Sequence, residues 1–388
     1  MTNFLVRISG KVLKRKDLLF SIAPAKQKSF MNRLECPGDD IDRGYCQYRC
    51  QMKLLGKSLA LLYNMASIPL IVIYKKTIPR PNKEINKKVR VPAIFMYDGD
   101  NSILPLSLKD KYNVIQIRDF QRRMCLTASD KSFLKELRKR YPLSFHFYLK
   151  CMLKVAMYRY QFIRNNPEIV IVSEEYSFTS SVLTKYCESN GVKHFNVMHG
   201  EKLYYMRDSF FHFHECYVWD EHYKMLFIDL NAEPSQFIIE MSPCWMSWNQ
   251  DGVEKSIDYT YYLGAEQTKT LIKIKQSLAI LLHAGAKVAI RPHPIYSSVK
   301  EVQRIFDKEE GYIIETKDDV PIKNSILRTR HAVSCYSTVL IQAINNGVRA
   351  VLDDVTDRNK FERLKELGYI CMKKEHSLLS GVLSGRDN

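Results

Sequence analysis

Two apolar runs separated by a helical pattern decide the fold: Glu168-Ile169-Val170-Ile171-Val172-Ser173 and His194-Phe195-Asn196-Val197-Met198. The first run is continuous, as is typical of a strand that is covered on both faces. Residues 178–190 have helical spacing, and Gly191 follows them as a favourable residue for a helix end. A strand, a helix and a second strand of these lengths form a βαβ crossover, in which the two strands are parallel. The sequence therefore predicts an α/β fold with a parallel sheet.

The same alternation of strands and helices continues on both sides of this unit. Helical spacing recurs over 130–164, 266–283 and 337–346. Short strands are expected at 91–96, 113–117, 259–263, 287–290, 312–314, 332–333 and 350–352. A chain of 388 residues suits two domains. We expect a lead-in over 1–90, an N-terminal Rossmann-like domain over 91–245 and a C-terminal Rossmann-like domain over 255–380, joined by a connection within 241–256.

The chain is strongly basic, with a formal net charge of +17. This charge indicates an anionic partner, which could be nucleic acid, an anionic membrane face or a phosphorylated substrate. The basic residues form short clusters at 11–16, 87–90 and 138–140. A cluster of this kind is often only a solvated face, but their bias toward the N-terminal part favours contact with a membrane surface there.

An apolar segment over 54–74 could anchor the chain to a membrane. Lys57, Asn64 and Pro69 interrupt it, so that a buried or interfacial segment is favoured over a true span. Lys75 and Lys76 follow it, as expected for a peripheral anchor on the inner leaflet. The first ten residues lack the apolar region and cleavage site of a signal peptide.

The 10 cysteines show neither a disulfide framework nor a convincing zinc site. Cys46 and Cys50 form the closest pair, and no CxxC repeat is present. The cysteines are therefore interpreted as reduced, mostly buried thiols, which indicates a cytoplasmic protein without a bound metal.

The first polar signature at a strand end is Arg291-Pro292-His293-Pro294. Ligands of parallel α/β sheets bind at the carboxyl ends of strands, and two prolines stiffen this turn. His293 could donate to a phosphate oxygen and stabilise a departing nucleotide phosphate, while Arg291 could add a charge-assisted bond. The alternative is a proline-rich turn with an exposed histidine.

The second signature is Ser334-Cys335-Tyr336-Ser337-Thr338, directly before a predicted helix. Hydroxyl groups at a helix N-terminus cap it, and one hydroxyl is enough for a cap. Three in five residues also fit a phosphate site, because free N–H groups and the helix dipole face the anion. We therefore predict that Ser334, Ser337 and Thr338 contact the donor phosphate.

The third signature is His199-Gly200-Glu201-Lys202, at the end of a predicted strand in the N-terminal domain. These residues place titratable groups where a ligand would bind, and Gly200 allows close backbone approach. A structural histidine is an equally good reading of His199. Arg207 follows in a stretch that is rich in aromatic and polar residues. Aromatic residues alone would belong to the core, but this mixture would also suit a sugar-binding platform.

Several carboxylates could act as a base at strand ends. An inverting transfer needs a group that accepts the proton of the acceptor hydroxyl. Asp98, in Tyr97-Asp98-Gly99-Asp100, follows the first clear strand, although an ordinary Asp-Gly turn explains it as well. Asp100 is a secondary candidate, and the adjacent pair Glu174-Glu175 competes for the same role.

The order of these motifs resembles that of bacterial surface-polysaccharide glycosyltransferases of the GT-B type. It is most similar to the group that includes bacterial sialyltransferases and polysialyltransferases, which have an acid-acid-Gly, a His-Pro and a paired Ser/Thr motif. The resemblance covers roughly residues 90–370. It implies two Rossmann-like domains that face across a cleft, no metal or other cofactor, a CMP-activated sugar such as sialic acid or another nonulosonate, and an inverting reaction.

The resemblance also implies roles for particular residues. His293 would be the ligand or acid of the donor phosphate, and Ser337 with Thr338 would hold that phosphate. Asp98 would be the base, although Tyr97 stands where the group has an acid. The His-Gly and Arg-Pro-His-Pro motifs also resemble CDP-glycerol glycerophosphotransferases of teichoic-acid synthesis and Kdo transferases of capsule export systems.

Two other classes of function compete with a transferase. A nucleic-acid-binding protein is supported by the charge alone, because the sequence has no recognisable reading motif. A sugar-nucleotide epimerase of similar fold would need no acceptor. The basic clusters and the apolar segment favour an acceptor that is a lipid-linked or growing polysaccharide. We therefore expect a bacterial cytoplasmic glycosyltransferase, peripheral on the inner membrane face, that builds capsule, O-antigen or lipooligosaccharide and binds no nucleic acid.

Overall fold

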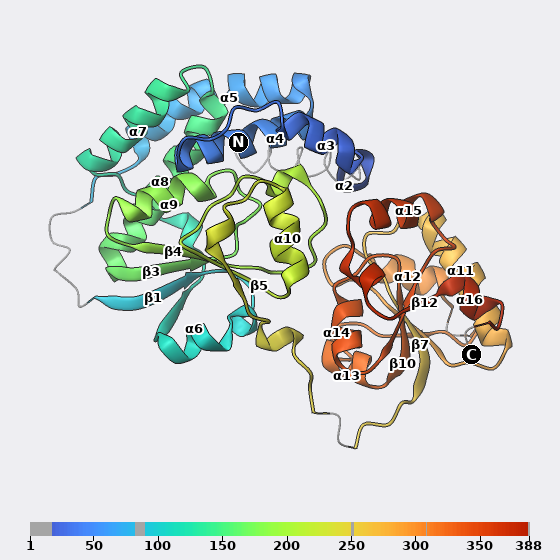
Figure 1. Ribbon diagram of the computed structural model, residues 1–388. Coiled ribbons are helices and arrows are strands. Elements are labelled where there is room, and N and C mark those ends of the chain that lie inside the picture. Colours follow the sequence, from blue (N-terminus) through green and yellow to red (C-terminus); the bar gives the residue numbers. More distant parts are fainter. Residues whose placement is uncertain (1–17, 82–89, 250–251, 308, 387–388) are drawn as a thin grey trace. The chain divides into compact units, whose positions relative to one another are not determined.

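The chain folds into two compact units, which are described separately below. The structure, a computed structural model, describes residues 18–81, 90–249, 252–307 and 309–386. The first unit contains the described residues up to His199 together with Tyr204–Cys244, and the second contains Gly200–Leu203 and the described residues from Trp245 onward (Figure 1). The basic clusters at 11–16 and 87–89 lie outside the described residues.

The first unit is built on a six-stranded sheet in which every pair of neighbours is parallel. Its spatial order is β2-β1-β3-β4-β5-β6. The strands are β1 (Val91–Met96), β2 (Val114–Ile117), β3 (Pro167–Val172), β4 (Lys193–Val197), β5 (Glu215–Val218) and β6 (Phe237–Ile239). Residues 169–172 pair in parallel with residues 193–196, which confirms the βαβ crossover and the parallel α/β fold.

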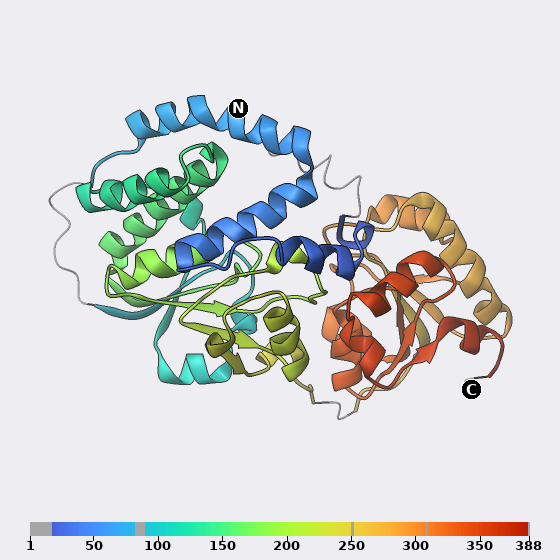
Figure 2. The same cartoon turned by 45° about the horizontal axis from the view of Figure 1, so that its top comes forward.

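Helices cover both faces of this sheet (Figures 1 and 2). They are α2 (Leu18–Ser21), α3 (Pro24–Met31), α4 (Asp40–Leu55), α5 (Lys57–Thr77), α6 (Leu106–Lys111), α7 (Ala128–Arg140), α8 (Phe145–Asn165), α9 (Ser180–Glu188) and α10 (Glu221–Asp229). Leu108 of α6 packs with Phe95, Ile171 and Phe195 on one face. On the other side, a second apolar cluster joins α4, α7, α8 and α9 through residues that include Ile41, Leu137, Phe147 and Val182.

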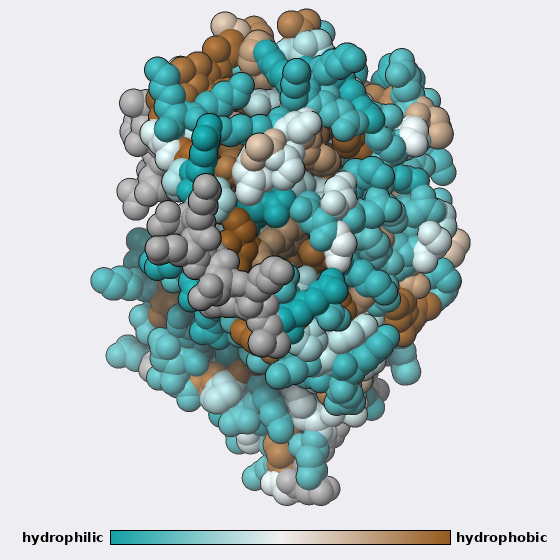
Figure 3. Space-filling model, turned by 90° about the vertical axis from the view of Figure 1, so that its left-hand side faces the viewer, coloured by the Kyte–Doolittle hydropathy of each residue, from teal (hydrophilic) through white to brown (hydrophobic). Residues whose placement is uncertain are grey.

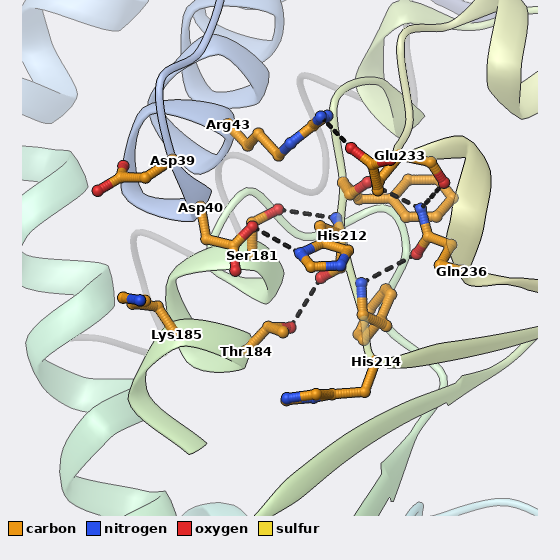
Figure 4. A network of polar contacts seen from close by, with 12 residues as sticks. Asp39, Asp40, Arg43, Ser181, Thr184, Lys185, His212, His214, Glu233 and Gln236 are labelled. Atoms are coloured by element: carbon orange, nitrogen blue, oxygen red, sulfur yellow. Dashed lines mark hydrogen bonds and ion pairs between the residues drawn. The ribbon is translucent and has the colours of Figure 1, made fainter. Parts of the chain in front are cut away.

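Helix α4 is fixed to the first unit by polar side chains of its first turn (Figure 4). Asp39 caps the helix by accepting from the N–H groups of Ile41 and Asp42. His212 Nδ1 lies 2.7 Å from Asp40 Oδ1, and Arg43 forms an ion pair with Glu233. The lead-in up to residue 81 is therefore packed onto the first unit.

The second unit repeats the same architecture. Its six-stranded parallel sheet has the order β12-β11-β10-β7-β8-β9. The strands are β7 (Ile257–Tyr262), β8 (Val288–Arg291), β9 (Ile313–Ile314), β10 (Thr329–Ser334), β11 (Arg349–Leu352) and β12 (Ser377–Leu378). The helices are α11 (Thr268–His283), α12 (Val299–Ile305), α13 (Ile322–Leu327), α14 (Val339–Asn345), α15 (Arg358–Glu366) and α16 (Leu379–Leu383). Two Rossmann-like domains are thus present, as predicted.

The structure differs from the sequence-based prediction in three places. The helical pattern over 130–164 is two helices, because the chain turns at residues 141–144, where Pro142 cannot continue α7. Strands β5, β6 and β12 were not predicted. The aromatic residues Phe210, Phe211 and Phe213 are buried, so that they belong to the core and form no exposed platform.

A buried ion pair links three helices of the first unit. Asp130 of α7 is 1% exposed and accepts from Arg159 of α8 and from Tyr186 Oη of α9, each at 2.7 Å. It also accepts from the N–H of Thr127 in a capping box. Burial opposes ionisation, but these hydrogen bonds outweigh it, and the pKa of Asp130 is lowered.

We expect Asp130→Ala to destabilise the protein by about 3–5 kcal/mol, because Arg159 is left partly buried without its counter-ion. Urea denaturation would measure the change. The control Glu136→Ala removes an exposed partner of Arg140 on the same helix and should cost less than about 1 kcal/mol. Since the folded pKa of Asp130 lies below its unfolded value of about 3.9, its contribution is complete above that value and is lost as the pH falls further. Equal effects of the two variants would contradict this assignment.

Candidate functional site

In each sheet the strand order reverses at one point. This point lies between β1 and β3 in the first unit and between β7 and β10 in the second. Open parallel α/β sheets bind ligands outside the carboxyl ends of the strands at such points. Asp98 and Glu174 follow β1 and β3, and Ser337 follows β10. These three residues therefore follow strands at the reversal points, whereas His293 follows β8, the neighbour of β7.

The carboxyl end of β3 carries two glutamates that are fixed by a buried asparagine. Asn196 of β4 is fully buried, and its Oδ1 accepts from the N–H of Glu174 at 2.8 Å. Its Nδ2 donates to Glu175 Oε2 at 3.1 Å. Glu175 is itself fully buried, and its carbonyl accepts from Gln47 of α4. Glu175 was predicted together with Glu174 as a candidate base, whereas Asn196 was not predicted as a site residue, because a buried polar side chain within a strand leaves no pattern in the sequence.

Glu174 is paired with a lysine of α8. Lys154 Nζ lies 2.5 Å from Glu174 Oε1, and both side chains are mostly buried. The second carboxylate oxygen, Oε2, is buried and accepts no hydrogen bond from the described residues. Glu174 thus has one oxygen held by a cation and one oxygen at the strand end that can still accept a proton or a hydrogen bond.

His199 lies in the same cluster. Its Nδ1 shares a hydrogen bond with Ser173 Oγ, and its ring lies 6.1 Å from those of Tyr97 and Tyr176. Gly200 has φ of +67°, which a side chain would strain, so the chain can turn sharply after His199. The ends of β1, β3 and β4 thereby bring Tyr97, Ser173 and His199 together.

Arg207 belongs to this cluster, whereas Glu201 and Lys202 are grouped with the second unit. The Arg207 guanidinium lies 5.6 Å from the centre of the Tyr176 ring, and its Nε donates to Asp208 at 2.6 Å. Within the second unit, the N–H of Glu201 donates to Thr338 Oγ1 at 3.4 Å. Lys202 is buried. The predicted His199–Lys202 motif is thus divided between the two units.

Asp98 and Asp100 are both exposed at the end of β1. Asp98 Oδ1 accepts from the N–H of Asp119 at 2.9 Å, which joins the ends of β1 and β2. Asp100 caps a short turn through Ser102, whose hydroxyl and N–H hydrogen bonds lower the pKa of Asp100 and make it a weaker base. A Cβ at Gly99 would lie 2.5 Å from the Tyr97 ring, so any larger residue there would require the Tyr97 side chain to move.

An arginine-rich pocket lies beside this turn. It has a volume of about 380 Å³ and is lined by residues that follow β2 and by the last turns of α8. Arg123 donates to Tyr160 Oη at 2.8 Å. This hydrogen bond is the main cause of the lowered pKa of Tyr160, and Arg164 lowers it further. The cationic lining residues are Arg118, Arg122, Arg123 and Arg164, against one carboxylate, Asp119. Arg118, Arg122 and Arg123 lie within six residues of the sequence, but Arg164 joins them only in the folded chain.

In the second unit, His293 is held in one tautomer. Its Nδ1 accepts from the N–H groups of Ile295 and Tyr296 at 3.1 and 3.3 Å. A neutral ring that accepts at Nδ1 carries its proton on Nε2. Burial lowers the pKa of His293, which keeps the ring neutral at pH 7. Nε2–H is therefore the donor that His293 can offer to a ligand.

The loop that carries His293 is tied to the end of β7. The N–H of His293 donates to Ser297 Oγ, and that hydroxyl donates to the carbonyl of Gly264, both at 2.9 Å. Glu266 also lies at the end of β7, where its Oε2 accepts from the N–H of Gly264 at 2.6 Å. Burial raises the pKa of Glu266. Glu266 was predicted only as part of a helix, and it is a further titratable group at the reversal point.

Arg291 has a supporting position. It is 7% exposed, and its Nη1 lies 3.7 Å from Glu315, which also forms an ion pair with Arg328. The guanidinium is thus directed at a fully buried carboxylate. Arg291 fixes the end of β8, two residues before His293, through this buried group.

The three predicted hydroxyls all make hydrogen bonds inside the second unit. Ser334 is fully buried and donates to the carbonyl of Tyr262 at 2.8 Å, which joins β10 to β7. Ser337 Oγ accepts from the N–H of Val339 at 3.2 Å in the turn before α14. Thr338 Oγ1 accepts from Glu201. Tyr369 Oη bonds to both the N–H and the carbonyl of Ser337, which fixes this loop.

Within the residues that the structure describes, no group of three or more His, Cys, Asp or Glu side chains is placed to hold a metal ion. The cysteines are all free thiols, and most of them are buried. Burial raises the pKa of Cys50 and of Cys335 to about 12, so that both remain protonated at neutral pH.

Solved structures with a similar arrangement include transferases and epimerases. The wall teichoic acid polymerase TagF is 10% identical, with 86% of this chain and 89% of that chain covered and a TM-score of 0.42. The S. aureus MnaA–UDP structure is 10% identical, with 71% and 87% covered and a TM-score of 0.45. The UDP-GlcNAc 2-epimerase from Neisseria meningitidis bound to UDP-GlcNAc is 11% identical, with 71% and 85% covered and a TM-score of 0.42.

No protein-family model matches the sequence, and no curated protein matches it. The strand order and the strand-end residues define the class: an α/β chain with two Rossmann-like domains. Each domain presents titratable side chains at its reversal point.

We expect ¹⁵N NMR of histidine-labelled protein to show His293 as the neutral Nε2–H tautomer at pH 7, with a pKa below 6.5. The spectrum of His293→Ala would assign the signal. His283→Ala, which removes an exposed histidine of the same unit, is the control and should leave the His293 signal unchanged. A proton on Nδ1, or a doubly protonated ring at pH 7, would show that the two backbone N–H groups do not hold the ring.

Proposed function

We propose that this chain is a glycosyltransferase that moves a sugar from a nucleotide-activated donor to a growing surface polysaccharide. The observation that carries the proposal is His293, because its ring is held so that a neutral Nε2–H is offered at the carboxyl end of β8. A neutral donor in a fixed orientation can stabilise a phosphate on which negative charge increases. The donor is therefore assigned to the second unit.

The donor proposed here is a CMP-activated sugar of the sialic acid or nonulosonate type. Ser337 and Thr338 lie in the loop after β10, and their hydroxyl hydrogens can donate to phosphate oxygens while the oxygens keep their present bonds. Arg291 and the buried hydroxyl of Ser334 support this edge of the sheet. A CDP-glycerol-type glycerophosphotransferase or another nucleotide-sugar transferase is the alternative.

The acceptor reacts at the first unit in this proposal. A base takes the proton of the acceptor hydroxyl, the hydroxyl oxygen bonds to the anomeric carbon, and the bond from that carbon to the phosphate oxygen breaks. The electron pair stays on the phosphate, where His293 stabilises it. Glu174, His199 and Asp98 are the candidates for the base, and the unbonded Oε2 of Glu174 favours the first. The reaction inverts the anomeric centre and uses no metal.

The acceptor is proposed to be anionic, because the arginine-rich pocket adjoins the β1–β2 edge. Its arginines present planar donors that match phosphate or carboxylate oxygens. A lipid-linked or polysaccharide acceptor with acidic groups fits this chemistry. The working environment proposed for such an enzyme is the bacterial cytoplasm, on the inner face of the membrane, during capsule, O-antigen or lipooligosaccharide synthesis.

A thermal-shift screen with CMP, CDP, UDP and GDP tests the donor. Ligand that binds only the folded state raises the melting temperature by mass action. We expect CMP or CDP to raise it and His293→Ala to weaken that binding by about tenfold, as for the loss of a hydrogen bond to a charged group.

The control for the donor test is His283→Ala, which should bind as the wild type does. If no nucleotide stabilises the wild type while duplex DNA does, the transferase proposal fails. An epimerase would convert its sugar nucleotide without any acceptor. A transferase should release free nucleotide only when acceptor is added, and measuring the release with and without acceptor distinguishes the two.

Pyrophosphate, titrated while the best nucleotide fills the donor site, tests the arginine-rich pocket. We expect the Arg123→Ala/Arg164→Ala double variant to bind it about tenfold or more weakly, because two cations are removed. Arg33→Ala, which alters an exposed arginine that follows α3, is the matched control and should leave binding unchanged. Unchanged binding in the double variant would remove the pocket from the acceptor site.

A further inference from the structure

Helix α5 presents apolar side chains on its outer side. Leu61, Leu62, Met65, Val72 and Ile73 are each between 50% and 63% exposed. Moving apolar side chains out of water is favourable. An exposed row of them therefore indicates a surface that another phase or molecule covers.

These side chains lie on one stripe. Their spacing of one, four, eleven and twelve residues after Leu61 follows the helical repeat, and the exposed Pro69 fills the gap in the middle. The 21 residues of α5 span about 30 Å at the α-helical rise. Figure 2 shows α5 as the outermost helix along its edge of the first unit.

The inner side of α5 is tied to the protein by polar groups. Asn64 Nδ2 donates to the carbonyl of Leu143 at 2.8 Å, and Asn64 Oδ1 accepts from the N–H of His146 at 3.1 Å. Ser67 is buried, and its hydroxyl lies 3.2 Å from His146 Nδ1. An ordinary surface helix buries its apolar side, and α5 has the reverse arrangement over these positions.

The apolar surface continues beyond α5. Leu143, in the turn between α7 and α8, is 77% exposed and is held beside α5 by its bond to Asn64. Figure 3 shows apolar side chains gathered near the top of the first unit, where α5 lies in Figure 1. The exposed apolar residues are therefore adjacent to one another, unlike the isolated apolar residues of an ordinary protein surface.

Cations stand at both ends of the stripe. Lys57 begins α5, Lys75 and Lys76 lie in its last turn, and α5 contains no acidic residue. Lys75 and Arg138 both lie over the ring of Tyr148, which adds a cation from α7 to the same edge. An apolar stripe with cationic ends matches a bilayer whose surface carries anionic headgroups.

We propose that the stripe of α5, together with Leu143, docks this protein on an anionic phospholipid bilayer, with α5 lying in the plane of the interface. Among the described residues, α5 is the helix that is long and apolar enough to cross a membrane, and only 11% of its apolar window is buried. A crossing helix would have to leave α8 and break the hydrogen bonds of Asn64 and Ser67. In-plane docking keeps them and buries the stripe.

Flotation of the purified full-length protein with vesicles tests this surface and does not depend on the transfer reaction. We expect binding to vesicles of phosphatidylcholine with 30% phosphatidylglycerol, about tenfold weaker binding to pure phosphatidylcholine, and weakening by salt. The Leu61→Ser/Ile73→Ser variant should bind the anionic vesicles at least about tenfold more weakly. Lys75→Gln/Lys76→Gln should lose much of the preference for anionic lipid.

The matched control is Ile272→Ser/Ile280→Ser, which alters two aliphatic side chains of α11 with 45% and 51% exposure. It should bind vesicles as the wild type does. Circular dichroism and the nucleotide-dependent thermal shift of each variant show whether it is folded and whether the donor site is intact, so a failure here is distinct from a failure of the proposed function.

Three results would overturn the proposal. The first is that the wild type does not bind anionic vesicles, or that Leu61→Ser/Ile73→Ser binds them as strongly as the control Ile272→Ser/Ile280→Ser does. The second is a wild-type dimer, seen by light scattering, that Leu61→Ser/Ile73→Ser dissociates without any change in vesicle binding. The third is retention in membranes after extraction with alkaline carbonate, which a spanning helix withstands and an in-plane helix does not.

Discussion

The parallel direction of the strands is the constraint on which the rest of this structure depends. Each described sheet has six strands, and all neighbouring pairs run the same way. Every strand therefore ends at the same edge, and side chains that follow different strands meet there whatever their distance in sequence. For this reason Ser173 bonds to His199 and Glu174 bonds to Asn196 at one edge. In the second unit, Ser297 of the His293 loop bonds to the carbonyl of Gly264. A mixed sheet would have placed these groups at opposite ends.

Buried charges hold both edges in place. Removing a charge from water is costly unless a partner and hydrogen bonds offset the loss, so groups such as Glu174, Glu315 and Asp130 persist only in fixed surroundings. Glu315 joins Arg291 and Arg328 beneath the His293 loop, and Lys154 neutralises Glu174. These pairs give rigidity where a ligand needs preorganised donors. The single donor of His293 has a separate cause, because the N–H groups of Ile295 and Tyr296 occupy Nδ1.

Much of the fold could be predicted from the sequence, because local patterns report it. The 168–198 crossover and the strands at β1, β2, β7, β8 and β11 carry apolar runs that any solvent-excluded strand must have. The strands β5 and β6 are embedded in polar and aromatic residues without clear turn signals, so periodicity did not separate them. The helix α4 has a polar pattern that local reasoning could not assign, and its order comes from partners such as His212 and Glu233.

The sequence by itself determined the fold class, the two-domain organisation and the strand-end placement of His199, His293 and Ser337, because these depend on local spacing and chain direction. Only the tertiary structure decided which polar groups face one another. It showed that Ser334 is used inside the sheet, that Glu266 stands at a reversal point and that Arg164 joins Arg123. It also showed that Asn64 and Ser67 of α5 bond to the rest of the first unit while five apolar side chains of the same helix are exposed. Burial and hydrogen-bond partners arise from segments that are distant in the chain, and local sequence carries no record of them.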